Sequence, residues 1–309
     1  MKKSFATCIF ILSLTLAIFP AKAQSNRLTV VASVFPLYEF AREVAGPFAD
    51  VRILLPAGVE PHSWEPKPSD IVFLSRADIF LYVGESMEPW AHDLVGAVKG
   101  KGLESVEIMD SSGFAGDDGP DSSKSIVNGG HDQGSDPHFW LDLAQAARAV
   151  RITGKILSAK DPGNGEIYTS RAAQYARRLE ELDMAFELGL SRCSSTILVT
   201  GGHAAFGHLA KRYGLTQVSI YGLSPDTEPS ARHMAAVIKQ VRELHVNTVF
   251  FEETVNPELA RVLSRETGAG MLSLNPVSNL TSAQWQSGTA LTDLMEQNLK
   301  SLREGLSCE

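Results

Sequence analysis

EIYTSRAAQYARRLEELDMAFELGL, residues 166–190, is the helical pattern around which the rest of the chain is arranged. It follows a break at Asp161-Pro162-Gly163, and its apolar side chains recur at helical spacing: Ile167, Tyr175, Leu179, Leu182, Phe186 and Leu190. At 1.5 Å per residue the pattern predicts a helix of roughly 37 Å. A helix of that length can cross between two lobes, so we expect residues 161–190 to link them.

On both sides of this helix, short β-branched runs alternate with helical patterns. Before it, the expected strands are Leu28–Phe35, Val51–Leu55 and Ile79–Val83, and the helices are Leu37–Ala45, Ser69–Ser75, Pro89–Val98 and Asp142–Ala159. After it, the expected strands are Ile197–Thr200, Gln217–Tyr221, Thr248–Phe251 and Met271–Leu274, and the helices are Ala204–Tyr213, Ser230–Leu244, Pro257–Thr267 and Ala283–Leu306. Strands separated by helices favour parallel sheets. The predicted fold class is therefore α/β, with two βα lobes at residues 24–160 and 191–309.

The N-terminus has the features of a secretory signal peptide. Lys2 and Lys3 precede an apolar run from Ser4 to Phe19, and Ala21-Lys22-Ala23 has the small-x-small form of a cleavage site. The run is short for a bilayer span, which needs about 20 apolar residues. We therefore expect residues 1–23 to be removed and the protein to reside in the periplasm, not as an integral membrane protein.

Composition and cysteine content narrow the possible partners. The chain has 28 basic and 36 acidic residues among 309, a net charge of −8, which argues against nucleic-acid binding. Residues 110–137 form a polar segment rich in Ser, Gly and Asp, which indicates a flexible acidic loop, either a weak metal-capture element or a solvated insert. Beyond the signal peptide the cysteines are Cys193 and Cys308, which in an oxidising compartment either pair or remain free thiols.

Three histidines lie where a strand or loop ends and a helix begins. His62 lies in a Pro/Gly-rich loop, His138 lies where the acidic segment meets a helix, and His203 follows a strand through Gly201-Gly202. Ligands gather at the carboxyl ends of strands in open α/β sheets, so the three imidazoles can converge. Imidazole nitrogens suit Zn(II), Cu(II), Ni(II) and Fe(II), whereas Mn(II) prefers more carboxylate oxygen. The alternative for each histidine is a solvated or helix-capping side chain, and spacing alone does not decide between them.

The neighbouring sequences resemble the metal-binding substrate-binding proteins of ABC transporters, the zinc and manganese receptor family. The resemblance runs from about Thr29 to the C-terminus. The stretches that carry it are PAGVEPHSWEP (56–66), PSD (68–70), AD (77–78), VG (83–84), DPHFWLD (136–142), GHAAFGHLA (202–210), YGL (213–215), EPS (228–230) and FFE (250–252).

The resemblance implies two lobes bridged by one rigid helix, with a metal held in the cleft between them. His62, His138 and His203 match the family's ligands, and histidine at position 203 favours zinc over manganese. Many members place an aspartate where this chain has Asn275, so the fourth ligand is left open among water, Glu60 and Asn275. The resemblance also implies that Glu252 orients a histidine.

The function implied is capture of zinc in the periplasm by a monomer. Delivery would be to the permease of an ABC transporter, whose separate ATPase subunit drives uptake. Manganese or another divalent metal is the alternative cargo. A secreted zinc-dependent hydrolase is the rival class, because three histidines with an open position also describe a catalytic zinc. No HExxH or G-x-S-x-G pattern is present, which favours a receptor over an enzyme. The third interpretation is an adhesin. The sequence shows no separate adhesive module, so such a role would be secondary.

Overall fold

The computed structural model describes residues 27–98, 100, 102–111, 135–223, 230–252 and 257–309. The expected signal peptide, most of the acidic segment with His131, and the Glu228-Pro229 pair lie outside these residues. Within the described part, no helix is both long enough and apolar enough to span a bilayer.

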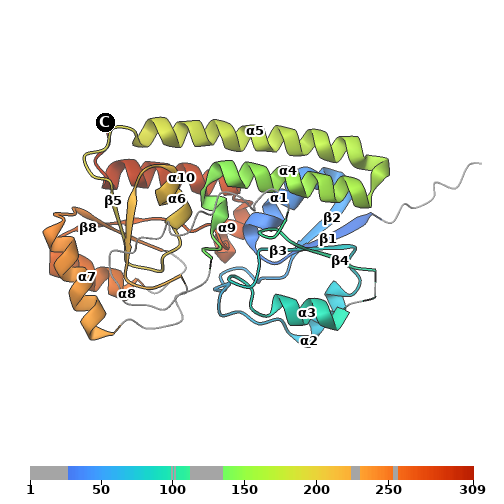
Figure 1. The fold of residues 1–309 in the computed structure, drawn as a ribbon, viewed down its shortest axis with the longest axis horizontal. Coiled ribbons are helices and arrows are strands. Elements are labelled where there is room, and N and C mark those ends of the chain that lie inside the picture. The colour runs from blue at the N-terminus through green and yellow to red at the C-terminus, as the bar shows by residue number, and fades with distance from the viewer. Residues whose placement is uncertain (1–26, 99, 101, 112–134, 224–229, 253–256) are drawn as a thin grey trace, which may run out of the picture.

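Two four-stranded parallel sheets form the two lobes, which confirms the predicted fold class (Figure 1). The first sheet has the order β2-β1-β3-β4 and is built from β1 (Leu28–Ala32), β2 (Ala49–Ile53), β3 (Ile79–Tyr82) and β4 (Glu104–Glu107). The second has the order β6-β5-β7-β8, from β5 (Ile197–Thr200), β6 (Thr216–Ser219), β7 (Thr248–Phe251) and β8 (Gly270–Ser273). The central strands β1 and β5 are therefore each flanked on both sides.

Helices connect the strands within each lobe. The first lobe contains α1 (Phe35–Ala45), the short 3₁₀ turn η1 (Gly46–Phe48), α2 (Pro68–Leu74) and α3 (Ala91–Val98). The second contains α6 (Gly207–Arg212), α7 (Ala231–Glu243) and α8 (Glu258–Thr267). Between and after the lobes come η2 (Phe139–Leu141), α4 (Leu143–Lys160), η3 (Pro162–Asn164), α5 (Gly165–Leu190), α9 (Ser282–Ser287) and α10 (Leu291–Gly305).

The long helix α5 has 26 residues and runs along one side of both lobes (Figure 1). It packs against α4, α1 and α10. Its buried side chains follow the helical period, including Tyr168, Tyr175, Leu179 and Phe186. The exposed face of α5 is mostly polar, with Arg177, Arg178 and Glu181, although Met184 and Leu188 near its end are also exposed.

One hydrophobic core passes through both lobes on the side of α5. The same cluster contains Val30 of β1, Phe186 of α5 and Leu198 of β5. The outer faces of the two sheets have separate cores, one beneath α2 and α3 and one beneath α7 and α8. A shared core couples the lobes, since separating them would expose apolar surface at a cost of about 25 cal/mol per Å².

Two features of the fold differ from the sequence prediction. Strand β4 was not expected, because Glu-Ser-Val-Glu has neither an apolar run nor a β-branched one. The predicted single helix Ala283–Leu306 is wrong as one element: α9 ends at Gly288, which has a left-handed φ of 69°, and α10 begins only at Leu291. Glycine adopts this conformation without steric cost, so Gly288 ends α9.

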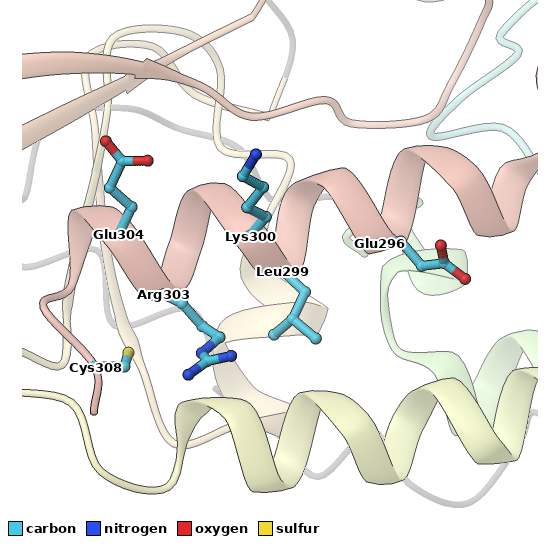
Figure 2. A pocket seen from close by; sticks show the side chains of 6 residues that line it. All are labelled: Glu296, Leu299, Lys300, Arg303, Glu304 and Cys308. Atoms are coloured by element: carbon cyan, nitrogen blue, oxygen red, sulfur yellow. The ribbon is translucent and has the colours of Figure 1, made fainter.

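The last helix packs closely on the end of α5. Figure 2 shows Leu299 and Arg303 of α10 pointing toward α5. Gly189 of α5 lies beneath them, since a Cβ there would stand 3.1 Å from Leu299 Cδ1 and 3.3 Å from Arg303 Cδ. The hollow that these side chains line with Glu296, Lys300, Glu304 and Cys308 contains none of the three histidines.

A disulfide joins Cys193, just after α5, to Cys308, just after α10. It closes a loop with a sequence separation of 115 residues. Replacing both cysteines by serine is expected to lower the free energy of unfolding by about 2–5 kcal/mol, because the cross-link restricts the unfolded chain. Urea denaturation of the oxidised wild type against the double variant measures this. Wild-type protein reduced beforehand is the control and should unfold like the variant; equal midpoints in all three would contradict the prediction.

Candidate metal centre

Each of the three predicted histidines lies at a junction between elements. His62 is in the irregular segment between β2 and α2, and His138 immediately precedes η2. His203 lies between β5 and α6. The first two therefore come from the first half of the chain and the third from the second lobe. His138 and His203 are buried, whereas His62 is partly exposed.

The structure brings the three imidazoles together through their Nε2 atoms. Nε2 of His138 lies 3.3 Å from Nε2 of His62 and 3.2 Å from Nε2 of His203. Of the described His, Cys, Asp and Glu side chains, these three alone form a group whose ligand atoms all lie within 4.8 Å of one another. Zinc binds imidazole at about 2.0–2.1 Å with tetrahedral angles, which places two such nitrogens roughly 3.3 Å apart. The observed spacings fit that geometry.

Carboxylates hold two of the rings from behind. Nδ1 of His138 lies 2.8 Å from Oδ1 of Asp136, and Nδ1 of His203 lies 2.9 Å from Oε1 of Glu252. The same carboxylate oxygens accept the backbone N–H groups of these histidines, each at 3.0 Å. A proton on Nδ1 leaves Nε2 with its lone pair free, so both rings are held in the tautomer that binds a metal through Nε2.

Two glycines leave room for these carboxylates. A Cβ on Gly202 would stand 1.9 Å from Oε1 of Glu252, and one on Gly207 would stand 2.5 Å from Oδ2 of Asp136. His208 completes the support, because its Nε2 lies 2.9 Å from the Asp136 carbonyl oxygen. Residues 202–208 therefore contribute His203 to the cluster. They also leave room for the carboxylates of Glu252 and Asp136, and through His208 they contact Asp136, which supports His138.

The protonation of the three rings differs with their surroundings. Burial and the neighbouring His138 and His203 lower the pKa of His62 to about 2. Burial also lowers the pKa of His138, against the opposing effect of Asp136. Burial acts in the same direction on His203, but the carboxylates around it, Glu252 first and then Glu60 and Asp136, together outweigh burial and raise the pKa of His203. In the absence of a cation, His203 is therefore the ring that holds a proton most readily.

Comparison with known proteins decides the family. Residues 30–305 match the family described as zinc-uptake complex component A, periplasmic (ZnuA). This chain belongs to that family. It is 35% identical to the high-affinity zinc uptake system protein ZnuA of Bacillus subtilis over 290 residues, which cover 93% of this chain and 90% of the relative.

Two further likenesses come from Streptococcus pneumoniae. The chain is 36% identical over 284 residues to the zinc-binding lipoprotein AdcA, covering 92% of this chain and 56% of the relative, so it spans about half of that protein's length. The solved Zn(II)-bound ZnuA-like domain of AdcA aligns with a TM-score of 0.75 at 35% identity, over 91% of this chain and 99% of the domain. These relatives are named for zinc binding and zinc uptake, and neither name denotes an enzyme.

The structure does not assign a side chain to the fourth coordination position of the expected site. Glu60 accepts the backbone N–H of His62 through Oε1 at 3.1 Å, and its carboxylate is not in the three-histidine group. Oδ1 of Asn275 accepts the N–H of Val277 at 2.7 Å, so this oxygen already serves the backbone. Glu60 and Asn275 therefore remain proposals for the fourth position, alongside water.

Glu252 is predicted as an orienting residue, and the structure places it against His203. From the sequence, Asp136 has no predicted role except as part of the acidic segment. In the structure, its carboxylate contacts Nδ1 of His138 as Glu252 contacts Nδ1 of His203. A signal for it exists in the sequence: Glu60-Pro61-His62 and Asp136-Pro137-His138 repeat the order acid, proline, histidine. In both, the acid accepts the histidine backbone N–H two residues on.

Proposed function

We propose that this chain captures zinc and hands it to the permease of an ABC transporter, whose ATPase subunit drives uptake. The observation that carries the proposal is the convergence of three Nε2 atoms at zinc-like spacing, with carboxylates behind His138 and His203. The family membership and the names of the relatives support the same cargo. His62, His138 and His203 are the proposed ligands, and Glu252 and Asp136 orient two of them.

Zinc is preferred over manganese in this proposal because of the donor atoms. All three proposed ligands are imidazole nitrogens, which suit zinc, whereas manganese favours carboxylate and water oxygens. Competition titration with a chromophoric chelator should show one zinc per chain, and zinc should raise the thermal unfolding temperature more than manganese does. Greater stabilisation by manganese would overturn the proposed cargo.

The proposal includes a receptor role and not catalysis. A catalytic zinc keeps an open coordination position and needs a positioned base. Here the carboxylates of Asp136 and Glu252 contact the rings of His138 and His203 and are engaged as orienting groups.

We further propose that residues 1–23 direct the chain to the periplasm and that the protein acts as a monomer. Its first lobe is residues 24–160, its linking helix is residues 161–190, and its second lobe is residues 191–309.

Zinc binding should release one proton, from His203, at pH values below the pKa of that ring in the folded protein. Zinc binds neutral imidazole, and the lowered pKa values of His62 and His138 make those rings neutral already. The raised pKa of His203 makes it the ring that must lose a proton. We therefore expect zinc affinity to fall about tenfold for each pH unit below the pKa of His203 in the folded protein. Competition titrations at several pH values around 6.5, the ordinary histidine pKa, measure the slope.

The Glu252→Gln variant is the control for this slope. Removing the carboxylate removes the attraction that raises the pKa of His203, so the loss of affinity should begin at a lower pH than in the wild type. A wild-type slope of two or more protons would show that His62 or His138 is also protonated near neutrality, which would contradict the lowered pKa of those two rings.

A further inference from the structure

His62 is held differently from the other two proposed ligands. Asp136 and Glu252 contact Nδ1 of His138 and His203, whereas Glu60, the acid at the matching place before His62, accepts the backbone N–H of His62 at 3.1 Å. His62 also lies in a segment without regular structure, between β2 and α2. The position of this ligand therefore depends on how its own segment is held.

Hydrogen bonds from the second half of the chain hold the turn that ends three residues before His62. Residues 56–59 form a tight turn in which the N–H of Val59 lies 3.3 Å from the carbonyl oxygen of Pro56, and Gly58 has a left-handed φ of 77°. Nδ2 of Asn279 donates to the carbonyl oxygens of both Pro56 and Val59, each at 2.8 Å. The N–H of Gly58 donates to the carbonyl oxygen of Leu280 at 2.8 Å.

The Asn279 amide is fully used by these contacts. Its two N–H groups serve the two turn carbonyls, and its Oδ1 accepts the N–H of Leu280 at 2.8 Å. This pattern sets the orientation of the amide, because a reversed amide would place oxygen against two carbonyl oxygens. Asn279 is 5% exposed, so water does not replace these bonds readily.

The segment that carries Asn279 is itself firmly anchored. We call residues 275–281, which follow β8, the strap. Asn298 of α10 bonds both the N–H and the carbonyl of Asn275, and Nε1 of Trp140 donates to the carbonyl oxygen of Pro276 at 2.8 Å. Val277 has a φ of 60°, a strained conformation for a β-branched residue that persists only where its surroundings impose it.

We infer that Asn279 is a positioning residue for zinc: from the strap it fixes the turn at 56–59 and so sets where His62 stands relative to His138 and His203. The second lobe thereby determines the position of a ligand that belongs to the first. The inference rests on the proposed zinc site and adds a residue that touches no metal. Loss of a residue that orients a metal ligand without touching the metal lowers metal affinity by about 10- to 100-fold.

The test compares zinc affinities of Asn279→Ala and Asn279→Asp with the wild type by chelator competition. Alanine removes both donors, and aspartate keeps the size while presenting oxygen to two carbonyls. Both should weaken zinc binding by about 10- to 100-fold and leave thermal unfolding of the metal-free protein cooperative. Thr281→Ala is the matched control. It removes the cap of α9 in the same strap, where Thr281 Oγ1 accepts the N–H of Gln284 at 3.3 Å, and should leave zinc affinity within about twofold.

A second measurement separates positioning from general destabilisation. In a His62→Ala background, Asn279→Ala should have no further effect on zinc affinity, because its action passes through His62. An equal loss in both backgrounds, or an Asn279 variant that binds zinc as tightly as wild type, would overturn the inference. If the wild type itself binds no zinc, the proposed function fails. If His62→Ala weakens binding and the Asn279 variants do not, only this inference fails.

Discussion

Replacing His138 by alanine is expected to weaken zinc binding more than about 100-fold, beyond the range that loss of an orienting partner produces. His138 is fully buried, and its Nε2 lies within 3.3 Å of the Nε2 atoms of both other histidines. It is therefore the central member of the group. Its removal also leaves the partly buried Asp136 carboxylate without the ring that it binds. Chelator competition titration measures the change.

His92→Ala is the matched control for this experiment. The His92 side chain is 97% exposed on α3, so its loss removes an imidazole without touching the group of three. Zinc affinity in this variant should equal that of the wild type. If His138→Ala bound zinc as tightly as His92→Ala does, the three-histidine site would be wrong, whatever the stability of either variant.

Gly202→Ala is expected to disrupt the site although it removes no ligand. A Cβ at this position would stand 1.9 Å from Oε1 and 2.8 Å from Cδ of Glu252, which is 3% exposed. Glu252 must then shift, and with it the ring and backbone of His203 that it holds. We expect zinc affinity to fall at least about 10- to 100-fold, and the free energy of unfolding to fall by about 1–3 kcal/mol.

Two comparisons make the Gly202 prediction specific. Gly96, in α3, has no atom from outside its own helix within 4 Å of the position of a Cβ, so Gly96→Ala should leave zinc binding unchanged. Glu252→Ala empties the space that the new methyl group needs, so adding Gly202→Ala to it should cost little more. Unaltered zinc binding in Gly202→Ala would show that Glu252 does not set the position of His203.

The long helix and the alternation around it could be predicted because both are local. The apolar side chains of α5 recur along one stretch of sequence, and the strands β5 and β7 coincide with runs rich in β-branched or aromatic residues. Strand β4 lacks such a pattern and depends on pairing with β3, and the break before α10 depends on one glycine. Neither feature has a periodic signal.

The metal centre could be predicted only in part, for a related reason. His62, His138 and His203 are separated by 76 and 65 residues, so only the folded chain brings them together, and the resemblance to a family supplied what spacing could not. Asp136 and Asn279 act through contacts with residues near and far, and Asn279 lies more than 200 positions from the turn that it holds. Sequence patterns carry no record of such contacts.

The central claim is that one zinc ion is held by the Nε2 atoms of His62, His138 and His203. Anomalous diffraction at the zinc edge, from crystals grown with one equivalent of zinc, tests this most directly. We predict a single strong peak about 2.0–2.1 Å from all three Nε2 atoms, with a fourth position that the same map identifies. A peak elsewhere on the chain, or one in contact with only one of these histidines, would contradict the three-histidine site.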